Sequence, residues 1–237
     1  MSQSQRNSGG WIPAIAGGVI GAALTGVVLF LGAPSLVGER LVRQALVDHP
    51  EMLVQAGEAL RDQQYASTLE PIRASLERPF FSSWQGAEKP EVTLTYFFDY
   101  GCGYCRQSNP DIQRLLKEEK GLRVVYRELP ILGPDSVAAA RVSLAASKAG
   151  KFLQYHDALY AAGRPGPDSI ALAAKSAGIP AQPTDDPTQE AELRANMTLA
   201  SQLGATGTPL FVVGNRVINA AVGYDALKEA VQAARKS

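Results

Sequence analysis

Residues Val92–Gln107, with the sequence VTLTYFFDYGCGYCRQ, decide the fold of this chain. The first seven residues combine β-branched and aromatic side chains, which is the composition of a buried strand. Cys102 and Cys105 then stand three positions apart, where a helix should begin. Apolar side chains at helical spacing between residues 112 and 116 indicate that helix. The stretch therefore predicts a strand that leads into a helix with two cysteines at its start.

The position of the two cysteines determines their expected chemistry. A sulfur at the first turn of a helix faces backbone N–H groups without partners and the positive end of the helix dipole. Both features favour the thiolate. We expect Cys102, the more exposed thiol, to be the nucleophile and Cys105, one turn further, to resolve the mixed disulfide. Gly101 and Gly103 leave little side-chain bulk around Cys102, which suits contact with another protein's backbone.

A Cys-x-x-Cys pair alone is also compatible with zinc binding or a small structural disulfide. Zinc takes about four ligands, and the chain offers only two cysteines and two histidines, His49 and His156, neither at ligand spacing. A disulfide that closes so short a loop constrains little of the unfolded chain. The strand before and the helix after favour redox chemistry, with no metal and no cofactor besides the cysteine pair itself.

Length, charge and the N-terminal segment bound the class of protein. The 237 residues allow one domain of good size, or one domain with an appendage, and the 23 basic and 23 acidic side chains give no indication of nucleic-acid binding. Residues 1–34 contain an uncharged run, Trp11 to Leu31, that is long enough to cross a bilayer as a helix. We expect an uncleaved signal anchor, with a cleaved signal peptide as the alternative. Both put the rest of the chain in an oxidising compartment.

Residues 35–78 form a second unit. Two apolar helical faces, at residues 36–46 and 52–60, are separated by Pro50, which suits the first turn of a new helix. Two short amphipathic helices cannot bury these faces alone. We expect a helical stalk that is a candidate oligomerisation region, with a plain spacer as the alternative. His49 at the break is expected to be a capping or surface residue.

The segment 78–90 is predicted to be a linker, with its aromatic side chains packed on the domain edge: Phe80, Phe81 and Trp84. The next strand is predicted at residues 123–129. A strand, a helix and a strand in this order make a βαβ unit, which is expected to be parallel and right-handed.

From about residue 135 to residue 204 the pattern is helical, which predicts an inserted helical region. Asp168 is expected to cap a helix over 169–177, and His156, among apolar positions, is expected to be structural. The remaining predicted elements are a strand at 210–213, a hairpin turn at Gly214–Asn215 and a final helix at 224–234.

Three motifs in this order resemble those of bacterial disulfide-bond proteins of the DsbA type, in particular the ScsC and Com1-like branch. The motifs are FFDYGCGYC at 97–105, ELPILGPDS at 128–136 and GTPLFVVG at 207–214. The resemblance implies an α/β protein, namely a thioredoxin fold with an inserted helical domain at about 135–204. In this view residues 79–237 are the DsbA-like domain, and the membrane anchor and the helical stalk precede it.

The resemblance implies a cis peptide bond between Thr208 and Pro209, in a loop beside Cys102 that offers backbone groups to an extended substrate chain. Thr208 would also help to set the stability of the thiolate. Gly103 and Tyr104 stand where strongly oxidising relatives have Pro-His, so we expect a milder oxidant. The same dipeptide occurs in disulfide isomerases, which are oligomeric.

A second departure from related sequences lies six residues before the first cysteine. Thioredoxins have a buried carboxylate there, which accepts the proton of the resolving cysteine, whereas this chain has Tyr96. Asp99, three residues before Cys102, is expected to be a surface cap, with a substitute acid as the alternative.

The sequence therefore predicts an extracytoplasmic thiol–disulfide oxidoreductase whose redox disulfide joins Cys102 and Cys105. The expected partners are cysteine-containing exported proteins, a DsbB-like or DsbD-like membrane redox partner and further copies of the chain. Association would favour isomerisation or reduction, and a monomer would favour oxidation. The expected location is the periplasmic face of the bacterial inner membrane, or the soluble periplasm after signal cleavage. Two other functions stay open: a non-catalytic envelope chaperone or scaffold with a structural disulfide, and a copper-tolerance protein that binds Cu(I).

Overall fold

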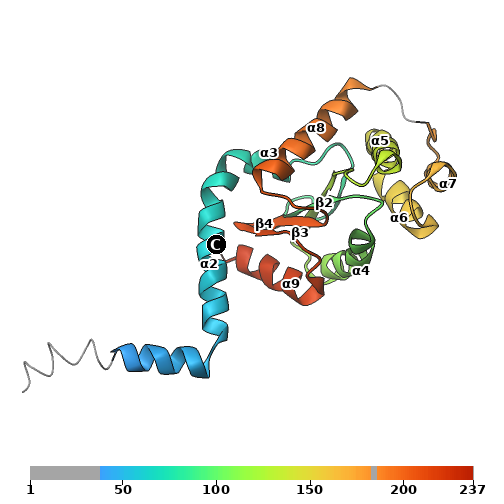
Figure 1. Ribbon diagram of the computed structural model, residues 1–237. Helices are drawn as coiled ribbons and strands as arrows, with labels where there is room; N and C mark the ends of the chain where they lie inside the picture. The colour runs from blue at the N-terminus through green and yellow to red at the C-terminus, as the bar shows by residue number, and fades with distance from the viewer. Residues whose placement is uncertain (1–37, 183–185, 237) are drawn as a thin grey trace, which may run out of the picture. The chain divides into compact units, whose positions relative to one another are not determined.

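The structure, a computed structural model, describes residues 38–182 and 186–236 (Figure 1). By its internal contacts the chain divides into two units, Met1–Ala59 and Leu60–Ser237. The anchor or signal peptide expected at residues 1–34 lies outside the described residues. Among the helices of the described part, none is both long and apolar enough to cross a membrane.

The first unit contains a helix over residues 38–48 and the beginning of helix α2 (Glu51–Leu69). The helix break predicted at Pro50 is confirmed. His49 is exposed there, and its Nδ1 lies 3.0 Å from Oε1 of Glu51. Large apolar side chains stay exposed on both helices, from 46% at Met52 to 72% at Val47: Leu41, Val42, Val47, Met52, Leu53 and Val54.

The second unit is built on a five-stranded sheet with the strand order β1-β3-β2-β4-β5. The strands are β1 (Trp84–Gly86), β2 (Val92–Phe98), β3 (Leu122–Glu128), β4 (Leu210–Val213) and β5 (Arg216–Ile218). β2 and β3 are parallel, as predicted, and the other pairs are antiparallel. The predicted strands are confirmed, with β3 one residue earlier than expected, and the hairpin turn lies between β4 and β5.

Residues 78–90, expected to be a linker and the entry to the domain, also contain a strand that was not predicted: β1 lies there and pairs with β3. Three residues are too few for an alternating pattern to be visible. Trp84 is half-buried under the guanidinium of Arg123, 4.8 Å from its ring centre. Phe81 does not pack on the domain edge as expected: it is 58% exposed, with a φ of 43°.

Helices cover both faces of the sheet (Figure 1). They are α3 (Arg73–Glu77), α4 (Gly103–Glu118), α5 (Pro134–Lys148), α6 (Phe152–Ala162), α7 (Pro167–Ala177), α8 (Pro187–Gln202) and α9 (Gly223–Ala234), with a 3₁₀ turn at Glu70–Ile72. One buried cluster joins the sheet to α4, α5, α6, α7 and α9. The other joins the opposite face to α3 and α8. The cysteine helix α4 therefore lies on the better-covered face.

The four helices α5–α8 follow β3 and precede β4, so the predicted run of helices is confirmed. Asp168 does not cap α7 as expected. The N-cap is Gly166, and Pro167 occupies the first helical position, where its fixed φ suits a helix start. Asp168 therefore lies inside the first turn.

Candidate functional site

Cys102 is the N-cap residue of α4, with extended backbone angles (φ −81°, ψ 117°). Its Sγ accepts a hydrogen bond from the backbone N–H of Cys105 at 3.4 Å. The predicted helix start at the cysteines is thus confirmed. Both thiols are free, and Cys102 is 6% exposed whereas Cys105 is fully buried. The sulfur of Cys102 is the one nearer to solvent.

The Thr208–Pro209 loop, which is distant from Cys102 in the sequence, contacts the same sulfur. The peptide bond between these residues is cis, as the resemblance implied. The Cys102 thiol donates to the carbonyl oxygen of Thr208 at 3.1 Å. Pro209 directly precedes β4, which pairs with the strand that leads to the cysteines. The sheet register thereby brings two distant motifs together at one atom.

Cys105 has an apolar environment. Burial raises the pKa of its thiol to about 12, against a smaller opposing effect of a hydrogen bond with the Asp99 backbone. Tyr96 replaces the carboxylate of thioredoxins on the strand below, and its hydroxyl donates to the Cys105 carbonyl oxygen at 3.2 Å. Burial also raises the pKa of Tyr96 well above its ordinary value. Tyr96 is therefore a neutral donor near neutral pH.

Asp99 is buried, only 1% exposed, so the expectation of a surface cap was wrong. Its Oδ1 accepts from the N–H of Gly101 at 2.7 Å, and its Oδ2 accepts from the N–H groups of Ile131 and Leu132 at 2.8 and 2.9 Å. The carboxylate therefore fastens the turn before Cys102 to the loop after β3. The sequence motif contained that loop but gave no sign of the contact.

The turn Asp99–Cys102 is closed by the N–H of Cys102, which donates to the carbonyl oxygen of Asp99 at 3.0 Å. The Tyr160 hydroxyl donates to the same oxygen at 3.3 Å. Tyr100, inside the turn, is buried and contacts Ser143 and His156. The turn is thus fixed from several sides before α4 begins.

A buried carboxyl group, Glu128, was not singled out from the sequence. The Ser143 hydroxyl donates to its Oε1 at 2.7 Å, and burial raises its pKa to about 8. His156 is buried as expected of a structural histidine, and burial lowers its pKa to about 3. Glu128 ends a strand beside the end of β2, which is the one signal that could have placed it near the cysteines.

Three large side chains near Cys102 in the sequence or beside its turn are exposed. Tyr104, between the cysteines, is 65% exposed, and Ile131 and Leu132 are 41% and 56% exposed. A Cβ on Gly101 would lie 3.6 Å from the Leu132 Cβ, so this loop borders the turn directly. At Gly103 a Cβ would meet nothing within 4 Å, so its surface is open.

Known structures with the same fold support a redox interpretation of this site. A periplasmic thioredoxin-like protein of Salmonella enterica serovar Typhimurium is 32% identical and covers 71% of this chain and 98% of its own, with a TM-score of 0.66. A thioredoxin-like oxidoreductase of Silicibacter pomeroyi is 36% identical and covers 65% and 92%, with a TM-score of 0.61. ScsC of Proteus mirabilis, in a transitional conformation, is 28% identical and covers 86% and 96%, with a TM-score of 0.66.

Sequence comparison gives two findings that cover different shares of the chain. Two curated relatives, the Na⁺/H⁺ antiporters NhaA 3 of Salinispora tropica and NhaA 1 of Salinispora arenicola, are 34% identical over 79 residues, 32% of this chain. The match spans only 12% of the length of either antiporter. The model of the DSBA-like thioredoxin domain matches residues 93–232, more than half of the chain. The chain therefore belongs to the DsbA-like thioredoxin family, whose members are protein-disulfide oxidoreductases.

Proposed function

We propose that this chain exchanges disulfides with cysteine-containing exported proteins through Cys102 and Cys105. The main support is the position of the Cys102 sulfur. It lies at the N-terminus of α4, 3.4 Å from the N–H of Cys105 and 3.1 Å from the Thr208 carbonyl oxygen. A helix N-terminus stabilises negative charge on such an atom.

The exchange proceeds by two displacements at sulfur. In the oxidising direction a client thiolate attacks Cys102 of the disulfide form, and Cys105 leaves as a thiolate and takes up a proton. A second client thiolate then attacks the client sulfur of the mixed disulfide and releases Cys102 as a thiolate. Two electrons pass from the client to the pair. The raised pKa of Cys105 favours its protonation after the first step.

Clients are proposed to bind in extended conformation along the Thr208–Pro209 loop, whose backbone groups precede β4. Three exposed large side chains are proposed to supply a second contact for the residues that flank the client cysteine: Tyr104, Ile131 and Leu132. Gly103 leaves room for the client backbone at the sulfur.

The proposed location is the periplasm. The support is the periplasmic thioredoxin-like protein of Salmonella, which covers 71% of this chain. Residues 1–34 are proposed to hold the protein at the inner membrane, with release by signal cleavage as the alternative. A DsbB-like or DsbD-like membrane protein would restore the working redox state of the cysteine pair.

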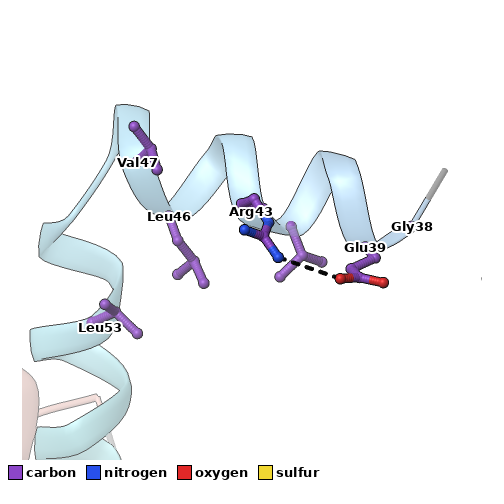
Figure 2. Close-up of a pocket in the computed structure, with 7 residues that line it drawn as sticks. Gly38, Glu39, Arg43, Leu46, Val47 and Leu53 are labelled. Atoms are coloured by element: carbon purple, nitrogen blue, oxygen red, sulfur yellow. Dashed lines mark hydrogen bonds and ion pairs between the residues drawn. The ribbon is translucent and has the colours of Figure 1, made fainter. Parts of the chain in front are cut away.

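We further propose that residues 35–78 assemble several copies of the chain. Where the helix 38–48 meets the start of α2, the side chains enclose a shallow apolar hollow of about 580 Å³. Figure 2 shows Leu46 and Leu53 in the angle between the two helices and the Glu39–Arg43 ion pair at the side. Such an exposed apolar surface favours burial against another copy.

An assembly with several Cys102 sulfurs favours isomerisation or reduction over oxidation, because a second thiol can attack an incorrect bond. The Gly103-Tyr104 dipeptide agrees with this direction, since it lacks the histidine of strong oxidants. A structural disulfide is the competing view, and the reduction potential separates the two. A value below about −300 mV would mark a bond too stable for exchange.

The decisive experiment is a trapping experiment with Cys105→Ala. Without the resolving thiol, Cys102 should stay joined to client proteins in mixed disulfides that a reductant releases. The double variant Cys102→Ala/Cys105→Ala is the control and should trap nothing. Equal amounts of protein on both variants, or none on either, would overturn the proposal.

A further inference from the structure

Four buried polar side chains form a chain of hydrogen bonds beneath the active-site turn. Ser143 Oγ lies 2.7 Å from Glu128 Oε1, the Tyr100 hydroxyl lies 2.9 Å from Ser143 Oγ, and His156 Nδ1 lies 3.3 Å from the Tyr100 hydroxyl. None of the four is more than 2% exposed. They come from β3, α5, the turn and α6, so this series of hydrogen bonds joins the helices after β3 to the cysteine motif.

The direction of the Ser143–Glu128 hydrogen bond assigns a donor to each of the other two bonds. Ser143 donates to Glu128, so its oxygen is free to accept from the Tyr100 hydroxyl. Tyr100 then accepts from His156, which burial keeps neutral by lowering its pKa to about 3. This order requires the Nδ1–H tautomer of His156. Each hydroxyl donates once and accepts once, and the series ends on the carboxyl group of Glu128.

Tyr100 connects this series of hydrogen bonds to the turn before Cys102. It is the second residue of the turn that the Cys102 N–H closes on the Asp99 carbonyl oxygen. Its ring centre lies 5.1 Å from that of Tyr160, whose hydroxyl binds the same carbonyl oxygen. A displaced Tyr100 side chain would therefore move the turn, and with it the sulfur of Cys102.

A buried carboxyl group, that of Glu128, is an unusual group to end a series of hydrogen bonds. Among the described residues its Oε2 has no hydrogen-bond partner, although it is buried. An apolar residue would avoid the cost of burying this group. Burial raises the pKa of Glu128 to about 8, so its charge changes just above neutral pH. The charged and titratable groups that interact with it are Arg127 on its own strand, Glu192 on α8, Tyr100 in the turn and Tyr155 on α6. His156 on α6 is connected to it only through Tyr100 and Ser143.

We propose that Glu128 is a positioning residue for Cys102, acting through Ser143 and Tyr100 on the turn that precedes α4. The chain of hydrogen bonds holds the sulfur against the Thr208 carbonyl oxygen and the first turn of the helix. The inference rests on the proposed function in one respect, since it takes Cys102 as the nucleophile.

The test measures how fast iodoacetamide alkylates Cys102 in the reduced full chain from pH 4 to pH 9, with the site of reaction read by peptide mass. Tyr100→Phe removes the bonds of Tyr100 to Ser143 and His156, and Ser143→Ala removes the bonds of Ser143 to Glu128 and Tyr100. Each variant should change the rate at pH 7 by about three- to tenfold. The matched control is Tyr155→Phe. It removes a hydroxyl from the same buried cluster, but one that donates to the Ala139 carbonyl oxygen instead. This control should match the unaltered chain.

Glu128→Gln separates charge from hydrogen bonding. Its amide oxygen still accepts from Ser143, so the rate at pH 7 should be retained. The step in the rate profile near pH 8, where Glu128 loses its proton, should disappear. Circular dichroism confirms that each variant is folded, and Ser143→Ala is the change least able to disturb packing.

The outcomes distinguish this inference from the proposed function. If Cys102 of the unaltered chain reacts only as fast as free cysteine at every pH, both are overturned. If Cys102 reacts rapidly at pH 7 but the profiles of Tyr100→Phe and Ser143→Ala superimpose on that of Tyr155→Phe, only the inference is overturned. Altered profiles in both variants, with an unchanged control, support it.

Discussion

The turn Asp99–Cys102 with Cys105 and the helices at residues 38–54 differ in how far their side chains are buried. In the turn, Asp99, Tyr100 and Cys105 are at most 2% exposed, and their polar atoms are bonded within the chain. In the helices, large apolar side chains such as Val47 and Leu53 are more than half exposed.

The two regions therefore depend on different contacts. The polar groups of the turn have their hydrogen-bond partners inside the domain, so the reactivity of Cys102 depends on contacts inside the domain. The exposed apolar surface of the helices is stabilised only when something else covers it. The comparison therefore predicts that changes in the turn alter reactivity and leave assembly intact, whereas changes in the helices do the reverse.

The largest expected effect is that of Cys102→Ser. A hydroxyl is a far weaker nucleophile than a thiolate at neutral pH, so disulfide exchange with a reduced or scrambled client should fall by about 10³-fold or more. The mass in solution, measured by light scattering, should not change. A change of mass would contradict the separation of the two regions.

The reverse experiment charges the helices with Val42→Glu and Leu53→Glu. Both side chains line the apolar hollow, and carboxylates there should prevent burial against another copy. The mass should fall to that of one chain, and isomerisation of a scrambled client should fall by about tenfold, by loss of neighbouring active sites.

The control for charge on these helices is Gln44→Glu with Gln55→Glu, two exposed positions on the same helices. It should leave the mass unchanged. The alkylation rate of Cys102 should be the same in all these chains. A monomeric unaltered chain would remove the preference for isomerisation.

Asp99→Ala tests how firmly the turn is held. The N–H groups of Gly101, Ile131 and Leu132 would lose their acceptor, which should cost about 2–4 kcal/mol in the free energy of unfolding. Urea titration measures it. Asp135→Ala, an exposed aspartate in the first turn of α5, should cost only about 0.5 kcal/mol. Equal losses would mean that Asp99 does not fasten the loop.

The sequence predicted what depends on local pattern and missed what depends on tertiary contacts. The strand Val92–Phe98, the helix start at Cys102 and the break at Pro50 follow from periodicity and backbone chemistry, and the structure agrees. Asp99 was expected on the surface because its partners, Ile131 and Leu132, are more than 30 residues away. The pairing of β1 depends likewise on a distant strand.

The cis bond before Pro209 shows the other route to a correct prediction. It followed from the family resemblance, since nothing in the local pattern distinguishes it. Glu128 lay within a motif that carried the resemblance, yet its burial and its contact with Ser143 appear only when α5 packs on β3. A side chain that acts on the site through another residue has no fixed sequence distance from the site, so a sequence pattern cannot reveal it.

The smallest expected effect is a change in how stability depends on pH. The pKa of Glu128 is raised from 4.5 to about 8 by burial, so between these values the folded chain holds a proton that the unfolded chain has released. Its contribution to stability is complete below pH 4.5 and is lost as the pH rises through 8. Glu128→Gln lacks this titration, so the free energy of unfolding of the variant should rise by about 2 kcal/mol relative to the unaltered chain from pH 6 to pH 8.

His156 contributes in the opposite direction, because its pKa is lowered from 6.5 to about 3 and its stabilising effect is lost as the pH falls through that range. It titrates equally in both chains, so it cancels in their difference. Urea unfolding at half-unit steps of pH measures that difference. The titratable groups of the helices at 38–54 are all exposed. A pH dependence of the stability difference would therefore come from Glu128 and the buried groups around the turn. Parallel stability curves would mean that Glu128 is already ionised at pH 6, and that the buried network beneath Cys102 carries a charge from pH 6 to pH 8.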